Sequence, residues 1–326
     1  MLGKHKIGLL FITLGVLAFV GCGSSSSTTQ PESTSSSSSS SIASATTRDI
    51  TNALLSNRSA NCEAYVNLYQ SMVQDVINNT DFKGSLNISV ENKKCYFTSN
   101  GIPNYDFNDG TGNFATRVSE QSINYEITAS PTKASTPTAL SLQYDNAIIL
   151  NGIKVDILAA ACYGVADEKI GCNDINTPWR LDPMSPLTRF GADSHHAHTQ
   201  PNGEYHYHGS PEALFDTAGS AESPVIGFAA DGFPIYGPYI SADGGIRKVT
   251  SSYQLKSGNR EAIQGVNPGG FYDGTYRDDY EYVAGKGDLD ECNGMTKDGA
   301  YGYYVTDSYP WILGCYQGIP DESFKK

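Results

Sequence analysis

Five of the six histidines lie within residues 193–209, which read DSHHAHTQPNGEYHYHG. Neutral imidazole nitrogens bind transition metals, so a compact group of histidines is typical of a metal site. Because the group contains no thiolate, it favours copper(II) or zinc as the bound ion. The same stretch is also compatible with a hydrogen-bonded polar cluster, or with a pH-sensitive contact surface that holds no metal.

The middle of this stretch predicts a tight β-hairpin. Pro201 fixes φ where a type I turn requires it, and Gly203 can enter the left-handed region. A three-residue hairpin loop with a glycine bulge has this pattern. If Gln200 and Glu204 close the loop, the register of the two flanking strands is set.

In this register the histidines share one face of the hairpin. His198 lies opposite His206, and the tyrosines that alternate with the later histidines point to the other face. Directly opposed Cβ atoms are about 4.5–5.5 Å apart. A shift of one residue would send half of the histidines to the wrong face. The candidate metal ligands are His196, His198, His206 and His208.

Two further residues are candidates for a supporting role. His195 falls on the opposite face by alternation. Asp231 could hold a histidine in one tautomer, as carboxylates next to metal-bound imidazoles usually do. The Asp231-Gly232 pair is equally explained by turn chemistry alone.

Composition favours a turn-rich β protein. The 326 residues are rich in Gly and Tyr, and only 17% of them are charged. Short β-rich segments at 123–127, 147–150 and 153–157 are separated by turn residues, which indicates a sandwich or barrel. The net charge of −13 leaves no basic surface for a nucleic acid.

The N-terminus predicts export. A short basic region at Lys4 and Lys6 precedes an apolar stretch and Cys22, which resembles a bacterial lipoprotein signal over residues 1–22. Cys22 would then carry the lipid anchor in the membrane, and Gly23 resembles the outer-membrane sorting pattern in a cell with two membranes. An ordinary cleaved signal peptide is the alternative. Residues 23–48 are nearly all Ser and Thr and predict a flexible linker.

Residues 49–94 predict a helical N-terminal extension, followed by a β domain at 95–326. Apolar residues recur at intervals of three and four between Tyr65 and Val76, and Asn61 is a suitable N-cap. Leu86, Ile88 and Val90 then alternate with polar residues, which indicates a strand.

Six cysteines remain after Cys22, and an even number in an exported chain predicts disulfides. Six cysteines allow fifteen pairings. We favour neighbours along the chain, because each such pair flanks one local segment. The predicted pairs are Cys62–Cys95, Cys162–Cys172 and Cys292–Cys315.

The stretch Tyr205–His208, together with 196–203 before it, resembles the signature of the YHYH-domain family. Further similar stretches lie at 99–104, 226–238 and 289–294, so the resemblance spans roughly Cys95 to Gly318. It implies a secreted or lipid-anchored protein and carries no established activity.

Common catalytic motifs are absent from the sequence. We find no Gly-x-Ser-x-Gly, no His-Glu-x-x-His and no phosphate-binding glycine loop. The first functional hypothesis is therefore extracytoplasmic metal binding, with affinity that falls as the pH drops through about 6–7. The second is a metal-dependent hydrolase or oxidase on the same site. The third is a surface interaction protein without metal.

Overall fold

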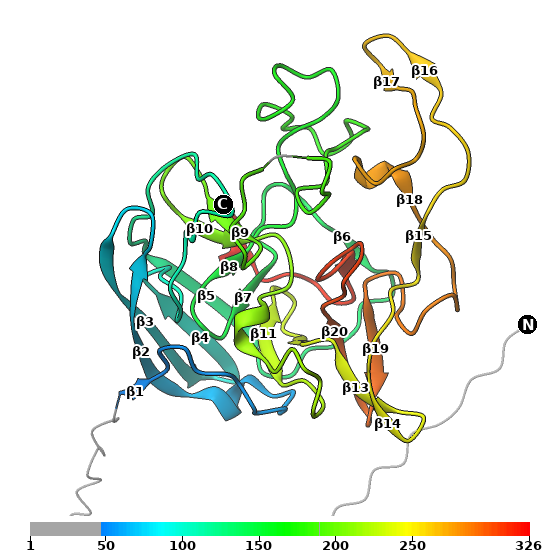
Figure 1. The fold of residues 1–326 in the computed structure, drawn as a ribbon. Helices are drawn as coiled ribbons and strands as arrows, with labels where there is room; N and C mark the ends of the chain where they lie inside the picture. Colours follow the sequence, from blue (N-terminus) through cyan, green and yellow to red (C-terminus); the bar gives the residue numbers. More distant parts are fainter. Residues whose placement is uncertain (1–46, 189) are drawn as a thin grey trace, which may run out of the picture. The chain divides into compact units, whose positions relative to one another are not determined.

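Strands dominate the regular structure in the computed structural model, which describes residues 47–188 and 190–326 (Figure 1). The mainly β fold predicted from the sequence is confirmed. The predicted signal peptide, Cys22 and nearly all of the serine-rich linker lie outside the described residues. Within the described residues, no helix has the length and apolar character needed to cross a membrane.

A five-stranded sheet forms the N-terminal part of the described chain. Strands β2 to β5 are antiparallel neighbours in chain order, and β1 pairs in parallel with β2 at one edge. The strands are β1 (Arg48–Asp49), β2 (Asn67–Asp75), β3 (Thr80–Glu91), β4 (Lys94–Ser99) and β5 (Ile123–Thr128).

The prediction of a helix within residues 49–94 is wrong. Residues Asn67–Asp75 form β2, which pairs with β3 along its whole length. Met72 is 56% exposed and Val73 is buried, so side chains alternate with the period of a strand. Cross-strand pairing has overridden the local helical pattern. Only one 3₁₀ turn, η1 (Cys62–Tyr65), forms here, and its N-cap is Asn61 as predicted.

The predicted boundary at residue 94 does not separate two bodies. It falls at the start of β4, inside the five-stranded sheet. The Cys62–Cys95 disulfide also crosses it. All of the described residues belong to one compact unit.

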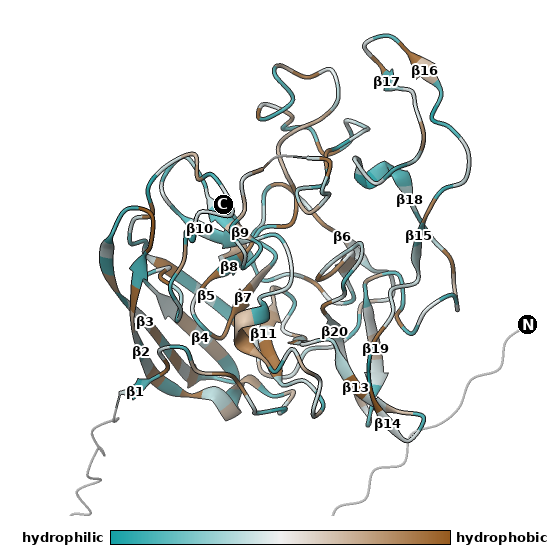
Figure 2. Cartoon of the chain, in the orientation of Figure 1, coloured by the Kyte–Doolittle hydropathy of each residue, from teal (hydrophilic) through white to brown (hydrophobic). Residues whose placement is uncertain are grey.

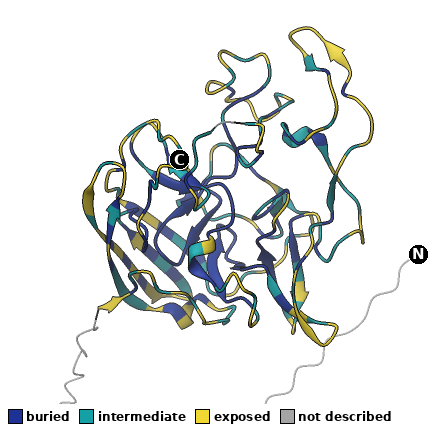
Figure 3. Cartoon of the chain, in the orientation of Figure 1, coloured by how far each residue is buried: buried dark blue, intermediate teal, exposed yellow. Residues whose placement is uncertain are grey.

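An eight-stranded mixed sheet carries the histidine-rich stretch at one edge. Its order is β19-β20-β12-β11-β7-β8-β10-β9. Figure 3 shows that β7 and β11 at its centre are buried, as expected for strands covered on both faces. The bounds are β7 (Ala147–Ile149), β8 (Lys154–Val155), β9 (Ala197–Thr199), β10 (Tyr205–Tyr207), β11 (Val225–Ala229), β12 (Pro234–Tyr236), β19 (Gly294–Lys297) and β20 (Ala300–Tyr304).

Aromatic side chains join the two sheets. Phe97 of β4 lies 6.1 Å from Phe228 of β11 between ring centroids, and Tyr65 meets the same ring edge-on at 5.6 Å. Figure 2 shows the apolar colouring of β11, the strand that carries Phe228. These buried rings supply much of the hydrophobic stabilisation at this contact.

Short elements complete the described chain. The two-stranded pairs are β6 (Thr138–Ala139) with β21 (Cys315–Tyr316), β13 (Tyr239–Ala242) with β14 (Gly245–Lys248), β15 (Tyr253–Leu255) with β18 (Tyr280–Tyr282), and β16 (Ala262–Ile263) with β17 (Asn267–Pro268). The further 3₁₀ turns are η2 (Glu212–Leu214), η3 (Arg277–Asp279) and η4 (Glu322–Phe324).

All three disulfides predicted from the sequence are confirmed: Cys62–Cys95, Cys162–Cys172 and Cys292–Cys315. Disulfides persist in oxidising compartments and are rare in the cytosol. The described domain is therefore of an extracytoplasmic type.

Candidate metal centre

The hairpin β9–β10 has the register predicted from its turn. The amide of Gln200 donates to the carbonyl of Glu204 at 2.9 Å, and Gly203 has φ +83°. His206 is paired with His198 across the two strands. Because Gly203 supplies the left-handed residue that the turn needs, the chain reverses without a shift of register.

Three of the four predicted ligands converge on this hairpin. The Nε2 atom of His208 lies 3.0 Å from that of His206 and 2.9 Å from that of His198. One ligand nitrogen from each ring lies within 4.8 Å of the others. This spacing is compact enough for one ion to contact all three nitrogens after small side-chain rotations.

Hydrogen bonds at the far side of two rings indicate their tautomers. The Nδ1 atom of His198 contacts the carbonyl of Phe190, and that of His206 lies 3.3 Å from the carbonyl of Glu204. A carbonyl only accepts, so each Nδ1 carries the proton and each Nε2 presents a lone pair. His208 alone can place a proton between the rings. One N–H cannot make two good hydrogen bonds at once, whereas with the His208 proton on Nδ1 a cation would satisfy all three Nε2 lone pairs.

Burial keeps these imidazoles neutral. His206 and His208 are almost fully buried, and burial followed by repulsion from neighbouring histidines holds the pKa of each well below its ordinary value. Burial also lowers the pKa of His198, which is partly exposed. Neutral imidazole is the form that binds metals, so at neutral pH the group has the protonation state that a metal site would need.

His196, the fourth predicted ligand, does not join the other three. Its φ of +61° is left-handed, so the backbone leaves the extended conformation just before β9 and the alternation of faces ends there. Its Nδ1 lies 2.9 Å from the carbonyl of Ser210. The side chain instead lines a cavity of about 380 Å³ together with Met184 and Trp311.

The two predicted support residues also lie away from the three imidazoles. His195 lies in the turn before β9, so strand alternation does not apply to it, and its ring lies 3.9 Å from that of Tyr105 between centroids. Asp231 is buried and accepts hydrogen bonds from the Tyr303 hydroxyl at 2.6 Å and the Gly318 amide at 2.9 Å. Asp231 therefore stabilises a junction between β12, β20 and the chain after β21, with no bond to a histidine among the described residues.

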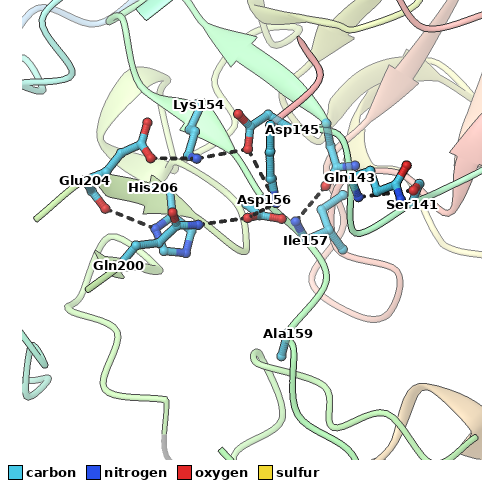
Figure 4. A network of polar contacts seen from close by, with 12 residues as sticks. Ser141, Gln143, Asp145, Lys154, Asp156, Ile157, Ala159, Gln200, Glu204 and His206 are labelled. Carbon is cyan, nitrogen blue, oxygen red and sulfur yellow. Dashed lines mark hydrogen bonds and ion pairs between the residues drawn. The ribbon is translucent and has the colours of Figure 1, made fainter. Parts of the chain in front are cut away.

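A buried charge network behind His206 was not predicted from the sequence (Figure 4). Lys154 of β8 lies 2.9 Å from Asp145 and 2.8 Å from Glu204. Burial opposes its charge, but the two carboxylates outweigh burial and raise its pKa. Because Glu204 also supplies the carbonyl that contacts His206, this ion pair helps to hold the turn next to that ring.

A second part of this network anchors the turn. Gln200 donates from Nε2 to Asp156 at 2.9 Å, and Lys326 is paired with the same carboxylate. Burial raises the pKa of Asp156. The only sequence signal for these contacts is the polar character of Lys154 and Asp156 within an otherwise apolar strand segment at 153–157.

The opposite face of the hairpin carries a tyrosine network. The Tyr205 hydroxyl donates to Asp193 at 2.8 Å, and Asn151 donates to the Tyr207 hydroxyl at 3.0 Å. Tyr105 contacts both hydroxyls. All three tyrosines are buried, and burial raises the pKa of each. These phenols stay protonated and act as structural hydrogen-bond donors.

Comparison with known proteins supports one assignment. No curated protein and no solved structure matches the chain. The sequence model described as "YHYH protein" matches residues 124–318, which is more than half of the chain and includes the whole hairpin. The chain thus belongs to the YHYH family.

Proposed function

We propose that this protein binds one transition metal ion, copper or zinc, outside the cytoplasm through His198, His206 and His208. The observation that carries the proposal is the convergence of three Nε2 atoms, two of which have no proton to share. Three neutral imidazoles without a thiolate suit copper(II) and zinc better than magnesium or calcium, which prefer oxygen ligands.

A metal titration of the mature chain tests the proposal. We expect stoichiometric binding. Calorimetry measures it for zinc, and electron paramagnetic resonance measures it for copper(II). His206→Ala and His208→Ala should each weaken metal affinity. The loss should exceed the roughly 10–100-fold that follows removal of a residue hydrogen-bonded to a metal ligand. His195→Ala is the matched control, because it removes a histidine of the same stretch whose ring packs against Tyr105. Equal affinity in all four proteins would refute the site.

A metal-dependent hydrolase or oxidase is the second candidate, favoured by the number of ligands. Catalytic zinc sites commonly use three protein ligands and keep a fourth position for water or substrate. With His196 outside the group, three histidines would leave that position open. The metal-loaded protein should then turn over an ester, phosphoester or peroxide substrate, and His208→Ala should abolish the activity. Binding without turnover would leave the simple metal-binding role.

Purification without chelators addresses the third possibility, a surface interaction protein. A stoichiometric transition metal found by elemental analysis would count against a purely protein-binding hairpin. Absence of metal, together with failure to bind added zinc or copper, would favour it.

We also propose that Cys22 is lipidated and holds the domain at a membrane, the outer one in a cell with two membranes. The support is the sequence of residues 1–22 and the presence of three disulfides in the folded domain. Cys22→Ser should move the protein from the membrane fraction to the soluble fraction. Mass spectrometry of the wild-type N-terminus should show a lipid on Cys22, and an unmodified cleaved N-terminus would refute the anchor.

A further inference from the structure

A second cavity gathers positive charge in an acidic chain. Its volume is about 480 Å³, within the range of small-molecule sites. Arg180, Lys256 and Arg277 line it, and Asp278 is the one carboxylate among its lining residues. The chain has a net charge of −13, so this local excess of cations is unlike the protein as a whole.

Arg180 has a structural role in this cavity. Its guanidinium donates to the carbonyls of Ala159 at 2.6 Å, Cys172 at 3.1 Å and Asp174 at 2.9 Å. These bonds tie together the loop that the Cys162–Cys172 disulfide closes. Burial, followed by the charge of Arg277, lowers the pKa of Arg180, and the carboxylates of Asp278 and Asp174 act in the opposite direction.

Arg277 and Lys256 retain hydrogen-bonding capacity. The Nη1 atom of Arg277 is buried and has no hydrogen-bond partner among the described residues. Its guanidinium carbon lies 5.1 Å from the ring centroid of Tyr309, which fixes one face of the group. Lys256 donates to the carbonyl of Asp278 at 2.7 Å, which uses one of its three N–H groups. A buried guanidinium nitrogen without a partner carries a desolvation cost, and an anion placed beside the guanidinium would offset that cost through its charge.

The rest of the cavity surface would accommodate an organic group. Tyr280 and Tyr309 stack with their ring centroids 4.2 Å apart, and both rings border the cavity. Leu140 and Leu158 add apolar surface. A bare inorganic ion would leave these surfaces unused.

We propose that this cavity binds a small organic anion, a carboxylate or phosphate monoester, through Arg277 and Lys256. The anionic oxygens accept hydrogen bonds from the two side chains, and the organic part lies against the stacked tyrosines. Charge-assisted hydrogen bonds from guanidinium to carboxylate or phosphate are among the stronger polar contacts in proteins. The site is separate from the three histidines and does not depend on the proposed metal.

Calorimetry on the mature chain tests this inference, with phenyl phosphate, benzoate, inorganic phosphate and neutral benzyl alcohol as probes. We expect saturable binding of at least one organic anion, weaker binding of inorganic phosphate and none of benzyl alcohol. Stronger binding of phenyl phosphate than of benzoate would identify a phosphate ligand, and the reverse order a carboxylate. No saturable binding of either organic anion would overturn the proposal.

Substitutions of the two cationic side chains test whether the organic anion binds in this cavity. Arg277→Gln and Lys256→Gln should each weaken binding by roughly tenfold or more, as expected for loss of a charged hydrogen-bond donor. Lys83→Gln makes the same charge change on the exposed face of β3 and should leave affinity within about twofold. Thermal unfolding checks that each variant is folded, and Lys256→Gln decides the matter if Arg277→Gln does not fold. Equal loss in Lys83→Gln would show a nonspecific charge effect and refute the site.

Discussion

The two faces of the β9–β10 hairpin differ in how their polar atoms are satisfied. On one face, Tyr205 and Tyr207 donate to or accept from fixed partners, including the carboxylate of Asp193. On the other face, the Nε2 atom of His208 lies within hydrogen-bond distance of those of His206 and His198, and one N–H cannot serve both contacts. The same backbone thus carries a completed network and an incomplete one.

We expect the completed network to have a structural role and the incomplete one to have a functional role. A fully satisfied buried network stabilises one conformation and needs no ligand. A buried group of lone pairs has a cost that a hydrogen-bond donor, a proton or a cation removes. The tyrosine face therefore positions the hairpin, and the histidine face is the one expected to bind.

The largest expected effect is stabilisation by metal. Zinc or copper at about 1,000 times its Kd should raise the free energy of unfolding by about 4 kcal/mol, because the ion binds only the assembled histidines. Urea unfolding with and without metal measures the difference. His208→Ala should remove the stabilisation, whereas His195→Ala should retain it. Equal stabilisation of His208→Ala would place the metal elsewhere.

The tyrosine face should respond in the opposite manner. Tyr205→Phe removes the hydroxyl that donates to Asp193 at 2.8 Å and should lower the free energy of unfolding by about 1–3 kcal/mol. Metal affinity should remain close to wild type. Tyr144→Phe is the matched control, since it removes an exposed hydroxyl that donates to Glu322 and should cost under about 0.5 kcal/mol. A large loss of metal affinity in Tyr205→Phe would show that the two faces are not independent.

The sequence was most informative where short-range chemistry decides the structure. Pro201 and Gly203 determine the turn locally, and with alternation they were enough to place His198 opposite His206. Neighbouring cysteines likewise gave the correct disulfides. Strand β2 was missed because its buried positions include the polar residues Ser71 and Asp75, so the apolar side chains alone follow a misleading helical spacing.

Other features of the site depend on contacts between distant segments. The pairing of Lys154 with Glu204 joins residues fifty positions apart through the parallel pairing of β8 and β10. Nothing in the local sequence specifies that contact. The left-handed conformation of His196 is also invisible in the sequence, because histidine has no general requirement for positive φ.

The dependence of stability on pH should reveal the buried imidazoles. Their pKa values in the folded, metal-free protein lie well below 6.5, whereas those of the unfolded chain lie near 6.5. The unfolded state therefore binds more protons below about pH 6.5, and the folded state loses stability as the pH falls from there. Each of these histidines lowers the free energy of unfolding by up to about 1.4 kcal/mol for each pH unit of this fall.

Denaturant unfolding of the metal-free wild type and His206→Ala across this window measures the effect. The slope should be smaller in the variant, and identical slopes would contradict a buried neutral His206. Metal affinity should also persist to lower pH than the window of about 6–7 predicted from free imidazole, because protons compete only below the lowered pKa values.

The smallest expected effect concerns His196 and defines the edge of the site. Its left-handed backbone and its contact with the Ser210 carbonyl direct it away from the other imidazoles. His196→Asn suits this conformation, because asparagine tolerates positive φ. Metal affinity should change by less than about twofold, which is under about 0.5 kcal/mol. His198→Ala, which removes a converging ring, should lose most of the affinity in the same titration. A comparable loss in His196→Asn would mean that the hairpin rearranges on binding to recruit a fourth histidine, and the incomplete face would then extend beyond β9.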